Sequence, residues 1–265
     1  MGLPNEVYLQ AGDQFKQRTL AQGPLYLPGV KGIGPNGDIY RYGQMGGVAG
    51  VVAKLYSAPA PVTLHVLQTA AAAAVGDTVI ALTLGATAVA ANDYINGKVS
   101  VDLASNTGFG YAYSIDAHPA VLASGVFTIP LAGSPRRTVQ ADGLVLTGNE
   151  TVQVAIATTA NSVSLIPNPY KKVVIAPASA ATGQISGIPQ VALPIGSWGW
   201  FKTRGPSMVL TDGTVIIGQE VAVSQSAAGA VAALSVTIAT TVTQVVIGHV
   251  VRVATTTNYS TINLT

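Results

Sequence analysis

A period-two alternation of apolar and polar residues recurs in most segments after residue 75. In residues 98–103, Val99, Val101 and Leu103 alternate with polar side chains, and residues 111–116 repeat the pattern. Further alternating segments lie at residues 152–156, 163–165, 221–223 and 234–238. This spacing predicts strands with one buried face and one wet face. No segment of comparable length has an apolar period of 3.6 residues, so we expect little helix.

Turn signals separate these apolar runs. Asn96-Gly97, Asp142-Gly143 and Asp212-Gly213 supply residues that adopt a positive φ, as tight hairpin turns require. The chain also contains 29 glycines and 15 prolines, which suit many turns. Short strands with frequent turns predict an all-β protein made of antiparallel sandwich or barrel lobes.

The first 47 residues differ from the rest, because they mix four prolines with many glycines and can bury little by themselves. We expect residues 1–47 to form an extended N-terminal arm that becomes ordered on docking. The alternative is a loop-rich strap over the chain's own domain. Two prolines in Pro167-Asn168-Pro169-Tyr170 break any strand and place a second boundary there. The expected lobes are therefore residues 48–172 and 173–265.

The chain is unusually poor in charge. Its 265 residues include 13 Lys/Arg and 11 Asp/Glu, or 9%, where soluble domains carry about 25%. At the same time 49% of the residues are hydrophobic, which is enough to bury a sizeable core. A surface with so few ionised groups loses little solvation energy when a neighbour covers it. Composition therefore favours a protein that works in contact with other subunits.

The few cations do not describe a nucleic-acid-binding surface, which needs clustered Lys and Arg. Arg136-Arg137, Lys171-Lys172 and Lys202 with Arg204 are isolated pairs, and the formal net charge is only +2. The chain has no cysteine, so disulfides and thiolate sites are excluded. We expect no nucleic-acid partner.

Two segments resemble a membrane span or an export signal only in part. Residues 221–251 carry no charge, but Ser, Thr, Gln and His interrupt them too often for a spanning helix. Residues 1–20 lack a continuous apolar stretch and include four charged residues, unlike a secretory signal. We expect no membrane partner.

Motifs for catalysis or cofactor binding are weak. Residues 32–37 match G-x-G-x-x-G, but no helix start follows, so we interpret them as a turn. His65, His118 and His249 are too far apart for a local metal signature, and Pro119 suggests that His118 ends a strand at a hydrated turn. There is no G-x-S-x-G elbow and no paired carboxylate motif. The sequence predicts a protein that is not an enzyme, with no catalytic residue, cofactor or metal site.

Both tryptophans lie in Trp198-Gly199-Trp200-Phe201. On a strand, Trp198 and Trp200 share one face, where they could pack in a core, stack on a sugar or anchor a subunit contact. Core packing is the default, and among the functional interpretations we prefer the subunit contact. The neighbouring sequence lacks the carboxylates and amides that orient sugar hydroxyls.

The order of several segments resembles that of a known family. These segments are Asn92-Asp93-Tyr94 with Gly97, residues 165–170, residues 198–206, residues 210–214, residues 225–231 and Ile247-Gly248. Together they resemble capsid decoration, or cement, proteins of tailed bacteriophages, particularly of marine and cyanobacterial phages. The resemblance covers roughly residues 76–265. It implies a β-rich auxiliary head protein, often trimeric, that sits on the outer capsid and braces neighbouring major capsid subunits.

From this resemblance and the composition we expect a structural virion protein, made in the host cytoplasm, that binds the major capsid protein. The arm would contact the capsid through its aromatic side chains Tyr8, Phe15, Tyr26, Tyr40 and Tyr42. Trp198 and Trp200 would lie between copies of a homo-oligomer, expected to be a trimer. The alternative is a carbohydrate-binding or receptor-binding β module of a phage tail or surface adhesin.

Overall fold

A computed structural model describes residues 6–132, 138–139, 145–146, 150–179, 181–234, 244–254 and 258–265. The chain divides into two compact units, each described below by itself. Unit 1 is formed by Pro61–Asn168, and unit 2 by Pro4–Ala60 together with Pro169–Thr265. The helical elements among the described residues are two 3-10 turns, η1 (Asp13–Phe15) and η2 (Thr63–His65). The prediction of an all-β protein is therefore confirmed.

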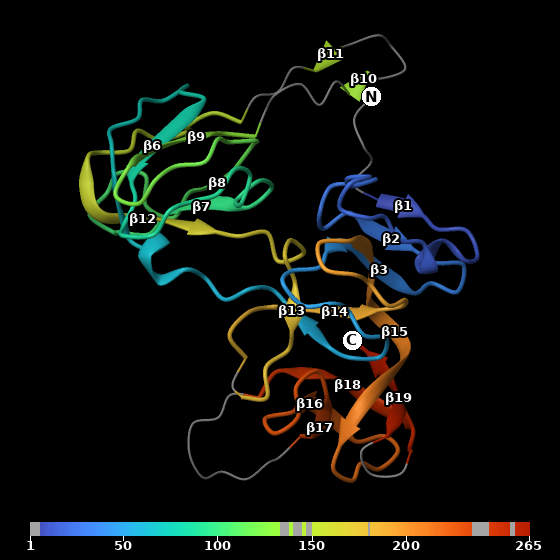
Figure 1. Cartoon of the computed structure of the whole chain (residues 1–265). Coiled ribbons are helices and arrows are strands. Elements are labelled where there is room, and N and C mark those ends of the chain that lie inside the picture. The colour runs from blue at the N-terminus through green and yellow to red at the C-terminus, as the bar shows by residue number, and fades with distance from the viewer. Residues whose placement is uncertain are drawn as a thin grey trace. The chain divides into compact units, whose positions relative to one another are not determined.

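Unit 1 is a curled six-stranded antiparallel sheet (Figure 1). In pairing order its strands are β8 (Ala112–Ser114), β7 (Lys98–Val101), β12 (Thr159–Ile166), β5 (Gln68–Ala70), β6 (Val79–Thr83) and β9 (Val126–Pro130). A bridge between Ile115 and Leu131 joins the ends of the two outermost strands, β8 and β9. A separate antiparallel pair is formed by β10 (Thr138–Val139) and β11 (Val145–Leu146).

The core of unit 1 lies inside this curl and is mainly aliphatic. The alternation read from the sequence places Val99 and Val101 of β7 and Val163 and Leu165 of β12 in it. Phe127 and Ile129 of β9 enter the same cluster. Side chains at the intervening positions point outward, as the period of two requires. One-sided burial therefore explains why these segments became strands.

Unit 2 is an eleven-stranded sheet organised around one long strand, β15 (Trp198–Asp212). The first part of β15 pairs with β3 (Ile39–Gln44), which leads to β2 (Lys31–Ile33) and β1 (Glu6–Tyr8). Figure 1 shows these blue strands beside the orange β15. Three short strands extend the sheet through β14: β4 (Tyr56–Ser57), β13 (Val174–Ile175) and β14 (Ile185–Pro189).

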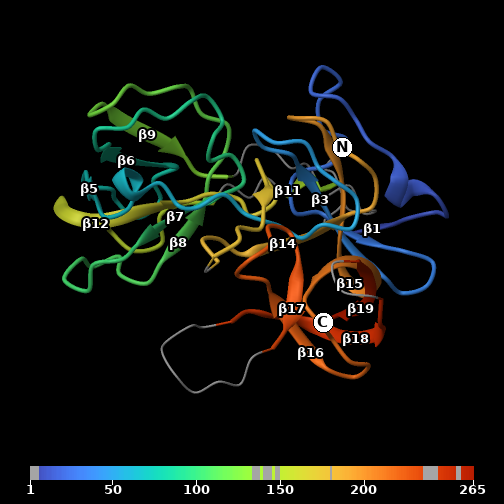
Figure 2. The same cartoon turned by 60° about the horizontal axis from the view of Figure 1, so that its bottom comes forward.

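The second part of β15 belongs to a closed five-stranded barrel, drawn in orange and red in Figure 2. Its ring runs β15, β17 (Val231–Ala233), β16 (Glu220–Val223), β18 (Val246–Arg252), β19 (Tyr259–Leu264) and back to β15. Gly205 marks the change of partners: Arg204 pairs with β3, and Gly205 pairs with β19. Gly205 has φ +98°, and a Cβ there would clash with Asp38, so the position requires glycine.

The division of the chain differs from the expected arm and lobes. Residues 6–44 are not a free arm, because β1, β2 and β3 are strands of the unit 2 sheet. The alternative, a loop-rich strap over the chain's own domain, is closer, because the segment stays on unit 2, but its strands are part of the sheet and do not lie over it. The expected lobes 48–172 and 173–265 are also replaced, since Pro61–Asn168 forms one unit and the segments on either side of it form the other. The boundary between Asn168 and Pro169 falls within the proline-rich seam.

Several local predictions have mixed outcomes. The G-x-G-x-x-G segment ends β2 with its first two residues and then forms the predicted turn that leads to β3. Residues 152–156 form no strand apart from a bridge at Ile156. Asn96 and Gly213 do have positive φ, but Asp212-Gly213 joins β15 to β16, which are not neighbours in the sheet. Asp142-Gly143, Arg136-Arg137 and residues 235–238 lie outside the described residues.

Among the residues that the structure describes, no helix is long enough and apolar enough to cross a lipid bilayer.

Candidate interaction surfaces

An aromatic cluster holds β3 against the first part of β15. Tyr42 lies 5.1 Å from Trp200 and 6.0 Å from Trp198 between ring centroids, and Tyr26 lies 5.4 Å from Tyr42. Tyr40 belongs to the same core cluster. The register explains the contact, because Trp200 pairs with Tyr42 and Trp198 with Gln44. Directly opposed aromatic side chains stabilise a strand pair beyond the area that they bury.

This cluster corrects four of the predicted interface residues. Trp198 and Trp200 are only 6% and 3% exposed, and Tyr40 and Tyr42 are buried as well. They pack on one another inside unit 2, so they are not available to a capsid or to another copy of the chain. The sequence could not separate the two outcomes, because an aromatic at alternate strand positions suits a core and an interface equally.

Two of the predicted arm residues remain on the surface. Tyr8, on β1, is 78% exposed, and Phe15, on η1, is 54% exposed. Tyr26 is half-buried, since its ring packs on Tyr42 and Trp200. Leu20 and Leu25 of the same segment are also exposed. Tyr8 and Phe15 can therefore still touch a partner without any rearrangement of the core.

An apolar groove lies elsewhere on unit 2, between the loop at residues 50–53 and the outer side of β15 and β19. We call it the Val52–Met208 groove; its exposed side chains are Val51, Val52, Ala192, Met208 and Tyr259. Its volume is about 560 Å³. The large side chains Val51, Val52, Met208 and Tyr259 are 39–46% exposed. No residue lining the groove is charged, and the guanidinium of Arg252 donates to the sulfur of Met208.

The loop that forms one wall of this groove is held in place by its backbone. The amide of Val51 donates to the Tyr56 hydroxyl, and Gly50 exchanges two hydrogen bonds with Leu193. The carbonyl of Ala53 accepts from the amide of Leu210. Val51 and Val52 cannot turn inward without breaking these bonds, each worth about 1 kcal/mol. The groove is thus a preformed apolar surface.

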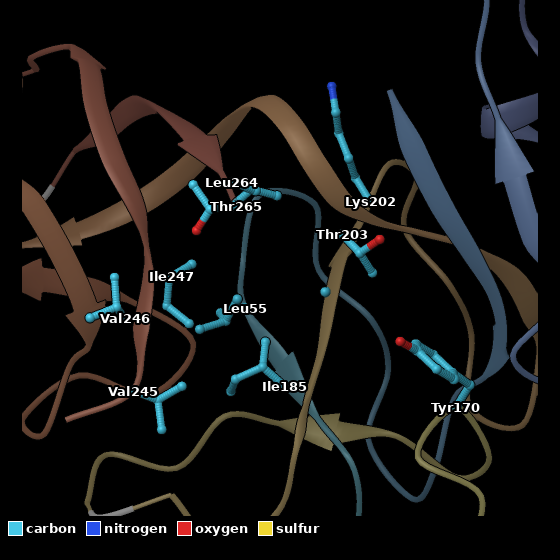
Figure 3. Close-up of a pocket in the computed structure, with 11 residues that line it drawn as sticks. Leu55, Tyr170, Ile185, Lys202, Thr203, Val245, Val246, Ile247, Leu264 and Thr265 are labelled. Atoms are coloured by element: carbon cyan, nitrogen blue, oxygen red, sulfur yellow. The ribbon is translucent and has the colours of Figure 1, made fainter. Parts of the chain in front are cut away.

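A second, smaller pocket opens at the end of the barrel (Figure 3). Its volume is about 210 Å³. Leu55, Ile185 and Ile247 point toward one another in it, while the side chain of Lys202 extends away. The Lys202 amine donates to Asp38 at 2.7 Å and to the carbonyl of Pro206. Because Lys202 is already paired, it offers no free positive charge to a ligand in this mainly apolar pocket.

Unit 1 contains a buried polar network around Tyr94. The Nε2 atom of His65 donates to the carbonyl of Thr87, and its Nδ1 accepts from the Tyr94 hydroxyl at 2.7 Å. The Nε2 atom of His118 accepts from the Tyr94 amide at 3.0 Å, which leaves its proton on Nδ1, facing the Pro119 carbonyl. Burial raises the pKa of Tyr94 above its usual range. His118 is therefore buried, which corrects the expectation of a hydrated turn.

These groups are not arranged for catalysis at a surface. Each ring nitrogen of His65 and His118 already has a protein partner, and both rings are almost fully buried. Across the described parts of the chain, no group of three or more His, Cys, Asp or Glu side chains could hold a metal ion.

Comparisons with known proteins identify no relative. No protein-family model, no curated protein and no solved structure matches this chain.

Sequence reasoning missed the Val52–Met208 groove, since its walls come from residues far apart in the chain. It also missed the Tyr94 network, which joins residues 65, 94 and 118. Residues 48–53 are apolar or glycine without the alternating polar residues of a half-buried strand. This run was the available signal for an exposed apolar loop.

Proposed function

We propose that this protein is a structural virion protein that binds the outer surface of a tailed-phage capsid and stabilises contacts between major capsid protein subunits. It acts as a homo-oligomer without enzymatic activity, made in the host cytoplasm. The proposal rests on the resemblance of residues 76–265 to capsid decoration proteins and on one structural observation. That observation is the preformed, uncharged groove on unit 2 together with exposed aromatic side chains on β1 and η1.

The energetics of covering such a surface support this function. Removing apolar area from water contributes about 25 cal/mol per Å². A charge on the same surface would oppose burial, because desolvation costs several kcal/mol for each ion. The groove offers apolar area without a charged lining residue, and the ions beside Tyr8 and Phe15 are already paired, Glu6 with Lys31 and Asp13 with Lys16. Many modest contacts of this kind, repeated over a lattice, hold a bound protein firmly through effective concentration.

The carbohydrate-binding alternative depended on Trp198 and Trp200 as a stacking platform. Both rings are buried, so neither face is available to a sugar. An exposed aromatic side chain, such as Phe109 or Tyr111 of unit 1, would have to replace them. A glycan array probed with the full chain separates the two functions, because only the alternative expects saccharide binding.

The test is co-sedimentation of the purified full chain with empty capsids from a panel of tailed phages of marine cyanobacteria. We expect saturable binding to at least one capsid. The double variant Tyr8→Ser/Phe15→Ser should bind about tenfold more weakly while unfolding like the wild type, because both side chains are exposed. Ile216→Ser, at another exposed apolar position of unit 2, is the matched control. Absence of binding to every capsid would contradict the proposal.

A further inference from the structure

The two units carry opposite formal charge. The sequence of unit 2 contains ten Lys/Arg and five Asp/Glu residues, a formal charge of +5. That of unit 1 contains three Lys/Arg and six Asp/Glu residues, a formal charge of −3. The small net charge of the whole chain hides this asymmetry. Surfaces of opposite potential attract one another, so the units of two different copies are electrostatically complementary.

Unit 1 has an outer sheet face that, like the groove, is lined by uncharged side chains. The outward side chains of its paired strands β6 and β9 form what we call the β6–β9 face: Val79, Ala81, Thr83, Val126, Thr128 and Pro130. None of them is charged, and Val79 and Val126 are both well exposed. Asp77, two residues before Val79, is exposed, and its carboxylate accepts a hydrogen bond from the amide of Ala74. The β6–β9 face is therefore an uncharged outer face of the curled sheet, in the unit that has a negative formal charge.

The Val52–Met208 groove has the opposite charge at its edge. Arg252 contacts Met208 and Thr261, so its guanidinium is held next to the apolar floor. No residue lining the groove carries a carboxylate. Placing two identical grooves together would bring two Arg252 side chains close, which is unfavourable. Placing the groove against the β6–β9 face instead pairs apolar area with apolar area and a cation with an acidic unit.

We infer that the Val52–Met208 groove of one copy binds the β6–β9 face of a second copy. The contact is heterologous: each copy contributes a different surface, and an open assembly has one free groove at one end and one free β6–β9 face at the other until a ring closes. This inference rests on the homo-oligomer of the proposed function and names the surfaces that form it.

The test is sedimentation velocity of the full chain over about 1–100 µM, the range in which contacts of this kind associate. The wild type should associate, and 0.5 M NaCl should weaken the association because the units carry opposite charge. Met208→Asp in the groove and Val79→Asp on the face should each weaken association about tenfold or more. Phe109→Asp and Ile216→Asp, at exposed positions outside both surfaces, should leave it unchanged. Near-UV circular dichroism checks that all four variants fold.

Mixing the two interface variants gives the decisive result. Met208→Asp keeps an intact β6–β9 face, and Val79→Asp keeps an intact groove, so an equimolar mixture should form a one-to-one dimer that neither variant forms alone. Three results would overturn the inference: a wild type that stays monomeric, controls that weaken association as much as the interface variants, or a mixture without dimer. The co-sedimentation assay is independent of this outcome. A monomer that binds capsids refutes only this inference, whereas an oligomer that binds no capsid refutes only the proposed function.

Discussion

Unit 1 is built from one continuous segment of chain, whereas unit 2 is assembled from two segments separated by more than a hundred residues. In unit 1 all six sheet strands and the core come from Pro61–Asn168. In unit 2 the strand β3 from the first segment pairs with β15 from the second. In unit 1, pairing joins strands of a single continuous segment. Unit 2 must bring distant strands together, which costs more chain entropy before any contact forms.

The two units also differ in what fills their cores. The core of unit 1 is mainly aliphatic and forms one cluster. Unit 2 has three clusters, and one of them is the aromatic contact of Tyr40 and Tyr42 with Trp198 and Trp200. Large aromatic contacts lie where the two chain segments of unit 2 meet. The comparison suggests that this cluster compensates for the entropy of joining distant segments.

The largest expected effect comes from removing the N-terminal segment. Deleting residues 1–47 should abolish cooperative unfolding of unit 2, because β15 loses β3 and the two tryptophans lose Tyr40 and Tyr42. Both tryptophans of the chain lie in unit 2, so their fluorescence emission should shift to longer wavelength. Hydrogen exchange of β6 and β9 should stay slow, since these strands belong to unit 1. Native-like emission from the truncated chain would contradict this comparison.

Matched core truncations come next in size. Trp200→Ala in unit 2 and Phe127→Ala in unit 1 should each lower the free energy of unfolding by about 3–5 kcal/mol, because both side chains are buried. Hydrogen exchange should show the loss of protection only in the unit that carries the substitution. Equal loss in both units would mean that they unfold together.

A smaller effect is expected at the polar network of unit 1. His118→Phe removes the acceptor of the buried Tyr94 amide and should lower the free energy of unfolding of unit 1 by about 1–3 kcal/mol. His249→Gln, in unit 2 at a partly exposed position, is the control and should change it by less than about 0.5 kcal/mol. Hydrogen exchange of the β7 amides, measured at increasing denaturant concentration, gives the difference in the free energy of unfolding. No change for His118→Phe would show that the amide finds another partner.

Alkaline pH should produce the most gradual change. Burial, with Asp38 nearby, raises the pKa of Tyr40 to about 12, and burial also raises the pKa of Tyr42, Tyr56 and Tyr170. A free tyrosine ionises near pH 10, so the unfolded chain loses its protons first. Stability is therefore complete below about pH 10 and falls as the pH rises toward 12, by at most about 1.4 kcal/mol per pH unit for each tyrosine.

This dependence is measured by chemical denaturation from pH 9 to 11 alongside phenolate absorbance at 295 nm. Tyr40→Phe should reduce the slope of stability against pH, because one buried ionisable group is gone. Tyr8→Phe is the control, since Tyr8 is exposed. Identical slopes for the wild type and Tyr40→Phe would contradict the assignment.

The fold class followed from the sequence because a period of two is a local property. The spacing of Val99 with Val101, and of Val163 with Leu165, is enough to predict one buried face. The structure places all four side chains in the core. The same reasoning failed at residues 152–156, where Val152 and Ile156 are buried but the backbone joins no ladder. Alternation reports burial of side chains, and strand formation needs a partner in addition.

The sites could be predicted less well, because burial and exposure of an aromatic side chain are decided by its neighbours. Tyr8 and Phe15 stayed on the surface while Tyr40 and Tyr42 entered a core, although all four lie in the same glycine- and proline-rich segment. The sequence of that segment does not predict that β3 pairs with β15, which begins about 150 residues later in the chain.

By itself, the sequence determined that this chain forms strands and turns and that its surface carries little charge, since each depends on residues near in the chain or on a simple count. The tertiary structure decided which strands pair, which aromatics are buried, and that the charges divide into a basic and an acidic unit. These outcomes depend on contacts between distant residues, where the entropy of bringing segments together is balanced against the area that they bury.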